Sequence, residues 1–169
     1  MRTFPVIRTE RFLLKQITKD NATVLNGVFE DDKTRKYLPE LYSLIDLDDG
    51  ILYFISTFDT YTKKGEGYLW GIYCNNDKLI GFVAVMDLSN SPTLFYAMHP
   101  IYRLQGYMKG AIYSVIDYLR KSKLCHKVLT DVYKENNISL HILKQLGFSA
   151  YREDDDKVYL SKCLLNDRF

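Results

Sequence analysis

Residues Tyr96 to Ala111 read YAMHPIYRLQGYMKGA and predict the end of a strand, a loop and the start of a long helix. The first turn of a helix presents backbone N–H groups without helical partners, and the helix dipole adds about half a positive charge there. Gly106 has no side chain, so an anion such as a pyrophosphate can approach this backbone closely. An ordinary strand-to-helix connection also fits, because the glycine-rich nucleotide motifs GxGxxG and GxxxxGK[ST] are both absent.

The elements around this segment predict a mixed α/β domain, with helices first, a hairpin next and alternating strands and helices last. Apolar residues recur with helical spacing from Met108 to Leu119, and Asn136 is placed to cap a helix that Gly147 ends. Strands are expected at 9–17, 68–74, 78–87, 93–98 and 127–133, with two more in 148–165, and helices at 19–29, 33–38, 46–61, 106–119 and 136–146.

Composition narrows the class of protein. The chain has 169 residues, 47% hydrophobic and 26% charged, which suits one globular domain with a substantial core. Its 23 basic and 21 acidic residues give no support for a nucleic acid or a membrane as partner, and no apolar run approaches the roughly 20 residues of a membrane span. Cys74, Cys125 and Cys163 form no CxxC pair, which indicates reduced thiols in a cytoplasmic protein and no metal site.

The loop sequence HPIYRLQGYMKGA resembles the acyl-CoA loop of the GNAT superfamily of N-acetyltransferases, written [RQ]-x-x-G-x-[GA]. Arg103 and Gly106 match this pattern, whereas Met108 stands where a small residue is usual. A second segment, ENNIS at 135–139 followed by LKQLGF at 143–148, is similar to the N-x-x-[AS]…K-x-G-F segment of the same superfamily.

The opening RTERFLLKQITKDNA, residues 8–22, resembles the ribosomal-protein N-terminal acetyltransferase branch. The resemblance implies one acyl-CoA N-acyltransferase-like domain over residues 1–169. Its fold would be a central, mostly antiparallel twisted sheet of about six or seven strands flanked by about four or five helices.

The resemblance also implies where acetyl-CoA binds. The cosubstrate would lie between the strand that ends at Met98 and the strand Lys127–Tyr133. The backbone of Ala97 and Met98 would pair with the pantetheine arm, and Asn136 would reach the pantetheine. Six backbone amides would receive the pyrophosphate: those of Leu104, Gln105, Gly106, Tyr107, Met108 and Lys109. The long side chain at Met108 would have to point away from the phosphates.

The chemistry requires two proton transfers. An amine attacks a thioester only when neutral, so the site must accept a proton from it and return one to the departing thiolate. Many relatives protonate the thiolate with a Tyr seven residues after the Asn, where this chain has Leu143. The resemblance to the ribosomal-protein branch assigns this role to Ser139, one helical turn earlier. A helix residue with only local hydrogen bonds is the alternative interpretation of Ser139.

The general base is predicted to be Asp131, at a position where several relatives hold an acidic residue. Strand alternation would put Asp131 and Tyr133 on one face of the sheet. A solvated or helix-capping carboxylate is the alternative interpretation, and Glu66, Asp87 and His99 are rival bases. Three tyrosines near the predicted site are candidates to line a substrate chain: Tyr96, Tyr107 and Tyr133.

Together these patterns predict a cytoplasmic N-acetyltransferase that transfers the acetyl group of acetyl-CoA directly to a primary amine. The expected acceptor is a protein N-terminus or a small amine, and the protein is expected to be a monomer or a homodimer. The alternative is a catalytically silent CoA-binding regulatory or interaction module, favoured by Leu143 and the lack of an obvious base. The acceptor side is expected on the helices of 19–61 and the loop 152–157.

Overall fold

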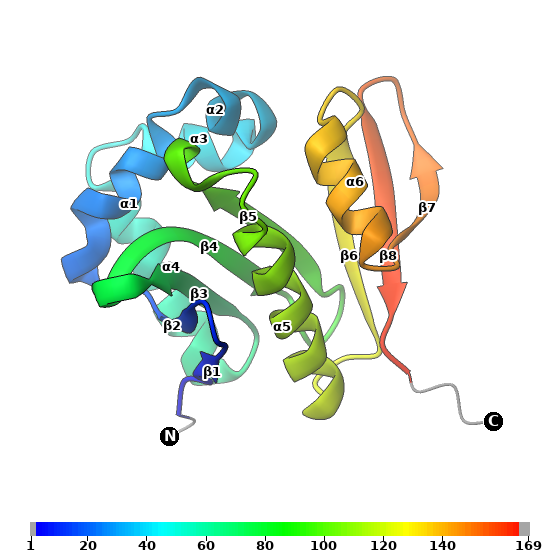
Figure 1. Ribbon diagram of the computed structural model, residues 1–169, viewed down its shortest axis with the longest axis horizontal. Helices are drawn as coiled ribbons and strands as arrows, with labels where there is room; N and C mark the ends of the chain where they lie inside the picture. The colour runs from blue at the N-terminus through cyan, green and yellow to red at the C-terminus, as the bar shows by residue number, and fades with distance from the viewer. Residues whose placement is uncertain (1–2, 166–169) are drawn as a thin grey trace.

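A computed structural model describes residues 3–165, which form one eight-stranded sheet with helices on both faces (Figure 1). The strand order is β1-β2-β3-β4-β5-β6-β8-β7, and every neighbouring pair is antiparallel except β5 and β6. The strands are β1 (Ile7–Arg8), β2 (Leu13–Gln16), β3 (Tyr68–Cys74), β4 (Lys78–Met86), β5 (Thr93–Met98), β6 (Lys127–Tyr133), β7 (Ser149–Glu153) and β8 (Lys157–Cys163).

Two hydrophobic cores lie on opposite faces of the sheet. The α-helices of the described chain are α1 (Ala22–Phe29), α2 (Asp32–Tyr37), α3 (Pro39–Ile45), α4 (Gly50–Lys64), α5 (Tyr107–Lys121) and α6 (Asn137–Gln145). Helices α5 and α6 pack on one face, and α1 and α4 pack on the other (Figure 1). Strand β4 is buried on both faces along its interior, which explains its nearly continuous apolar sequence.

The predicted class of fold is confirmed, and the strand and helix counts are each slightly higher than expected. The strand expected at 9–17 is observed only from Leu13 to Gln16, as β2, because the Thr9 hydroxyl oxygen accepts hydrogen bonds from the amides of Arg11 and Phe12 and holds a turn before it. The short strand β1 lies ahead of this turn and was not predicted. The helix expected at 19–29 begins as a 3-10 turn, Lys19–Asn21, before α1.

The helix expected at 46–61 is observed as α4, Gly50–Lys64, so its predicted bounds are wrong. Pro39 begins α3 as its first residue, a position where its missing N–H costs nothing, and this helix was not predicted. Asp49, with φ of 57°, separates α3 from α4. A β-carbon on Gly50 would lie 2.4 Å from the Leu44 carbonyl oxygen, so only glycine allows the two helices this close approach.

Candidate active site

Strands β5 and β6 run parallel but separate soon after they begin. In the described part of the chain their register holds one pair, Thr93 with Leu129. The Leu129 amide donates to the Pro92 carbonyl over 2.7 Å, and the Thr130 hydroxyl donates to the Leu94 carbonyl over 2.9 Å. Beyond these bonds the strands diverge towards α2, α3 and the start of α6 (Figure 1). We call this divergence the splay.

The edge of β5 that faces the splay is set by its pairing with β4. The His99 amide donates to the Ile80 carbonyl over 2.8 Å, so alternate residues from His99 backwards hydrogen-bond to β4. Ala97 belongs to this set, whereas the backbone groups of Tyr96 and Met98 point the other way, towards the splay. Arg103 Nε already donates to the Met98 carbonyl over 3.2 Å, so the Met98 N–H is the group that Met98 presents to a ligand.

The loop between β5 and α5 carries a run of backbone amides without partners. Within the described residues, no amide from 104 to 109 donates a hydrogen bond, and the Gly110 amide is the first to do so, to the Gly106 carbonyl over 3.1 Å. Leu104 and Gly106 have left-handed backbones, with φ of 61° and 82°. Such alternation turns successive N–H groups into one concavity that favours anions. The residues present therefore fit a bound diphosphate.

The side chains of α5 leave this concavity open. Met108 is buried in the core beneath α5, so its long side chain points away from the loop amides. Gly110 serves helix packing instead of the loop, because a β-carbon there would lie 3.2 Å from the ring of Phe12.

The arginine of the loop motif has a structural partner. Arg103 Nη2 pairs with Asp31 Oδ2 over 2.7 Å and donates to the Thr34 hydroxyl over 3.0 Å. Burial raises the pKa of Asp31, but hydrogen bonds from Arg103 and Thr34 outweigh it, and the pKa lies below its usual value. Asp31 also caps α2 by accepting from the Thr34 amide over 3.0 Å. Arg103 thus ties α2 to the β5–α5 loop.

Two hydroxyl groups meet across the splay. Asn136 caps α6 by accepting from the Ser139 amide over 3.3 Å, which fixes the first turn of the helix. Ser139 is buried, and its hydroxyl group hydrogen-bonds the hydroxyl group of Tyr96 on β5. Burial raises the pKa of Tyr96 to about 12, so its hydroxyl group stays protonated at neutral pH. Leu143 is fully buried in the core and offers no proton.

Asp131 projects from β6 and is paired. Its carboxylate lies 2.7 Å from Lys157 Nζ on β8, which also lies 3.4 Å from Glu40 Oε1 on α3. Burial lowers the pKa of Lys157, but the hydrogen bond that it donates to Asp131 and the nearby negative charges raise it overall. The Lys157 ammonium also stands 4.8 Å from the ring centroid of Tyr133, which shares the face of Asp131.

This cluster reaches the helices on the expected acceptor side. The rings of Tyr37 on α2 and Tyr133 on β6 lie 6.2 Å apart, and Lys36 Nζ lies 2.5 Å from Glu135 Oε2. With the Lys157–Glu40 pair, these contacts connect α2 and α3 to the far side of the splay.

The rival bases lie elsewhere or are occupied. The Glu66 carbonyl accepts from the Leu88 amide, and Asp87 accepts from the Ser91 amide, so both residues lie at the closed end, where β5 begins. His99 lies at the open end, but its Nδ1 accepts from the Ile101 amide over 3.4 Å.

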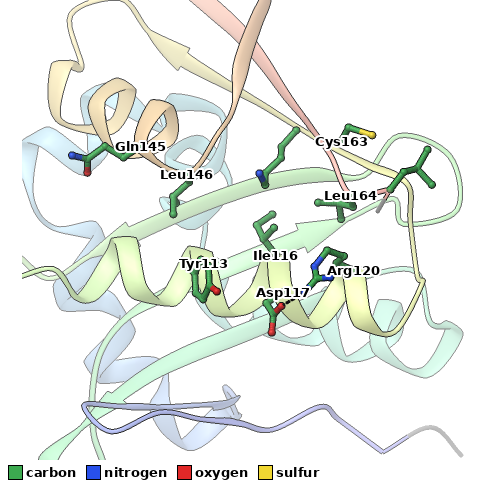
Figure 2. Close-up of a pocket in the computed structure, with 10 residues that line it drawn as sticks. Tyr113, Ile116, Asp117, Arg120, Gln145, Leu146, Cys163 and Leu164 are labelled. Carbon is green, nitrogen blue, oxygen red and sulfur yellow. Dashed lines mark hydrogen bonds and ion pairs between the residues drawn. The ribbon is translucent and has the colours of Figure 1, made fainter. Parts of the chain in front are cut away.

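A separate pocket of about 450 Å³ lies between α5, the end of α6 and β8 (Figure 2). Asp117 on its wall pairs with Arg120 and Lys121, each over 2.6 Å. None of the predicted site residues lines this pocket.

Within residues 3–165, no group of His, Cys, Asp or Glu side chains is arranged to hold a metal ion, and the three cysteines are free. The same residues include no helix with the length and apolar character that a bilayer crossing requires.

Sequence reasoning missed two features of the site. Tyr96 was expected only as lining, although its place two residues before Met98 on one strand puts both on the same edge. The position of Arg11 beside Gly106 depends on the β1–β2 turn, which no sequence pattern indicated.

The splayed sheet and the unpaired amides at its open end are those of an N-acyltransferase-type domain. Residues 11–149 match the model of the acetyltransferase (GNAT) domain family, and the chain belongs to this family of acetyltransferases. The chain is 25% identical over 151 residues to the uncharacterized N-acetyltransferase YoaA of Bacillus subtilis (strain 168), with 86% of this chain and 83% of YoaA covered.

Solved structures share the fold, and they include ribosomal-protein acetyltransferases. RimL, a ribosomal L7/L12 alpha-N-protein acetyltransferase in complex with coenzyme A, superposes with a TM-score of 0.83 at 10% identity over 94% of this chain and 98% of RimL. The spermidine N-acetyltransferase of Vibrio cholerae, in complex with CoA and spermine, gives 0.76 at 13% identity over 92% of this chain and 97% of its own.

Proposed function

We propose that this protein is a cytoplasmic, single-domain N-acetyltransferase that transfers the acetyl group of acetyl-CoA to a primary amine, a protein N-terminus or a small amine. The observation that carries the proposal is the run of six unpartnered amides from 104 to 109 at the start of α5. Membership of the GNAT family supports acetyl-CoA as the cosubstrate.

The diphosphate of acetyl-CoA would bind the loop amides, where the helix dipole and unsatisfied N–H groups both favour an anion. The Met98 N–H would hydrogen-bond the pantetheine arm, with Ala97 beside it in the strand. Asn136 would contact the same arm from the start of α6. Each assignment uses a group that faces the splay or borders it.

Acetyl-CoA supplies an activated acetyl group and a thiolate leaving group that must gain a proton. Ser139 is the proposed donor of that proton. A hydroxyl group has one hydrogen and two lone pairs, so if Tyr96 donates to Ser139, the Ser139 hydrogen is left for the thiolate.

Asp131 is the proposed acceptor of the proton that the amine loses, directly or through water. Its position on the acceptor face and its partial exposure support this role, but it must act beside the Lys157 ammonium. That pairing also favours the second candidate, a CoA-binding module without turnover, because a carboxylate oxygen that would take the amine proton already accepts a hydrogen bond from Lys157. Positioning alone can still accelerate such a reaction substantially.

Calorimetry with CoA tests the binding half of the proposal. Gly106→Ala should raise Kd at least 10-fold, because a methyl group would enter the concavity. Gly147→Ala is a matched control, since Gly147 has the same φ of 82° and lies at the end of α6. It shares the backbone strain and should leave Kd within about twofold. Wild-type protein that does not bind CoA would overturn the proposal.

The acceptor is tested with a panel of peptides bearing different N-termini, together with spermidine and spermine. The relatives named for ribosomal proteins and spermidine guide this choice. Release of free thiol together with an acetylated product, identified by mass spectrometry, is the expected result. Tight CoA binding without thiol release for any amine would favour the silent module.

A further inference from the structure

Arg11 lies over the start of α5, although it is near the N-terminus and far from α5 in the sequence. The Thr9 hydroxyl group fixes the β1–β2 turn by accepting from the amides of Arg11 and Phe12 and donating to the Phe12 carbonyl. Phe12 is buried and packs against Gly110 in the first turns of α5. The turn is therefore held rigidly beside the loop that carries the unpaired amides.

The Arg11 guanidinium reaches the loop itself. Its Cζ lies 4.3 Å from the ring centroid of Tyr107, and a β-carbon built on Gly106 would lie 3.3 Å from Nη1. The absence of a side chain at Gly106 is thus what brings the guanidinium against the loop backbone. Arg11 is exposed, and among the described residues no carboxylate forms an ion pair with it.

The contrast with Arg103 is informative. Arg103 is the basic residue of the loop motif, yet its guanidinium is occupied by Asp31 and Thr34. Within residues 3–165, the Arg11 guanidinium forms no ion pair and is stacked on the Tyr107 ring, so its N–H groups remain available to a ligand. A guanidinium in this state recognises phosphate oxygens well, because stacking restricts its rotamers before the ligand arrives.

We propose that Arg11 binds the diphosphate of coenzyme A, adding a positive charge from the β1–β2 turn to the amides of the α5 loop. This inference rests on the proposed function. The diphosphate is then bound by two groups of donors: the N–H groups of residues 104–109 on one side and the Arg11 guanidinium on the other.

The test compares, by calorimetry, the affinities of the protein for CoA, 3′-dephospho-CoA and pantetheine. Pantetheine is expected to bind weakly and is measured by displacement titration. Arg11→Gln should weaken CoA and dephospho-CoA equally, by about 10-fold, as expected for one partly exposed charge-assisted contact. It should leave pantetheine unchanged, because pantetheine has no phosphate. Arg11→Lys, which keeps the charge and loses the fork, should fall between wild type and Arg11→Gln.

Arg152→Gln is the matched control. Arg152 is also exposed and stacked on a tyrosine, with Cζ 3.8 Å from the Tyr159 ring centroid, but it lies on β7. Its loss should not change any of the three affinities.

Each other outcome has a separate meaning. An Arg11→Gln penalty that disappears with dephospho-CoA would assign Arg11 to the 3′-phosphate and overturn the diphosphate contact. A penalty shared by pantetheine would show that Arg11 only supports Tyr107, and an unchanged CoA affinity would remove Arg11 from the site. Failure of wild-type protein to bind CoA would instead overturn the proposed function.

Discussion

The hydroxyl groups of Tyr96 on β5 and Ser139 on α6 hydrogen-bond each other across the splay between β5 and β6. The two residues are 43 positions apart in the chain. Strand β5 holds one, and the capped first turn of α6 holds the other. This bond joins a protonated phenol to Ser139, the residue that the proposed mechanism uses to protonate the leaving thiolate.

Replacing Ser139 by Ala tests that assignment. We expect kcat to fall about 10²-fold with little change in the affinity for acetyl-CoA, because a general acid acts mainly in the transition state. Ser114→Ala is the control, since the Ser114 hydroxyl only bonds the Gly110 carbonyl of its own helix. Equal turnover numbers for Ser139→Ala and wild type would remove Ser139 from the mechanism.

Tyr96→Phe removes the phenol hydroxyl and keeps the ring. A fall in kcat of about 10-fold is expected, and none should follow when Ser139 is already Ala, because the two residues act as one unit. The Tyr96 pKa of about 12 predicts that wild-type kcat loses nothing from Tyr96 ionisation up to about pH 10. An alkaline fall in kcat below pH 10 that vanishes in Tyr96→Phe would contradict this account. Tyr113→Phe, at an exposed tyrosine of α5, serves as control.

Asp131→Asn tests whether Asp131 acts as the general base or only as the ion-pair partner of Lys157. Asn keeps the size and can still accept a hydrogen bond from Lys157, but it cannot take a proton from the amine. We expect kcat to fall by about 10². Glu135→Gln is the control, because Glu135 also pairs with a lysine beside the splay. Similar losses in the two variants would argue that charge around the acceptor matters and that Asp131 is not the base.

Asp31→Ala should destabilise the fold by about 1–2 kcal/mol, because it removes the cap of α2 and leaves Arg103 without its carboxylate. The lowered pKa of Asp31 means that its contribution exists above the ordinary carboxyl pKa and is lost as pH falls through the folded-state value. Thermal melts of the variant and wild type should therefore converge below about pH 4. The neighbouring exposed Asp32→Ala should change stability far less.

Asp154 provides a second pH-dependent contact, in the β7–β8 turn. Its carboxylate accepts from the amides of Asp156 and Lys157 and from the Tyr159 hydroxyl, which together lower its pKa to about 2. This contribution is fully present above the ordinary carboxyl pKa of about 4 and is lost as pH falls through about 2. Asp154→Asn should lower Tm by about 1–3 °C at pH 7, and the difference should shrink steadily as pH falls from about 4 to 2. A constant difference across that range, or an equal effect of Asp155→Asn, would contradict the assignment.

Much of the fold followed from local patterns. Strand β5, strand β6 and the start of α5 were predicted within a residue of their observed bounds, because their apolar spacing and Gly106 are local signals. The turn at Thr9 and the start of α3 at Pro39 were not, since each depends on hydrogen bonds or helix packing that no periodicity encodes.

The amino-acid order alone specifies the run of unpaired amides at the start of α5, since a helix start after a glycine exposes amides whatever surrounds it. It also specifies which residue caps α6. Folding adds the pairings between distant segments: Tyr96 with Ser139, Asp131 with Lys157, Arg103 with Asp31, and Arg11 over Gly106. These contacts join residues brought together by sheet order and helix packing, so their partners, and with them the division of chemical roles, emerge only in three dimensions.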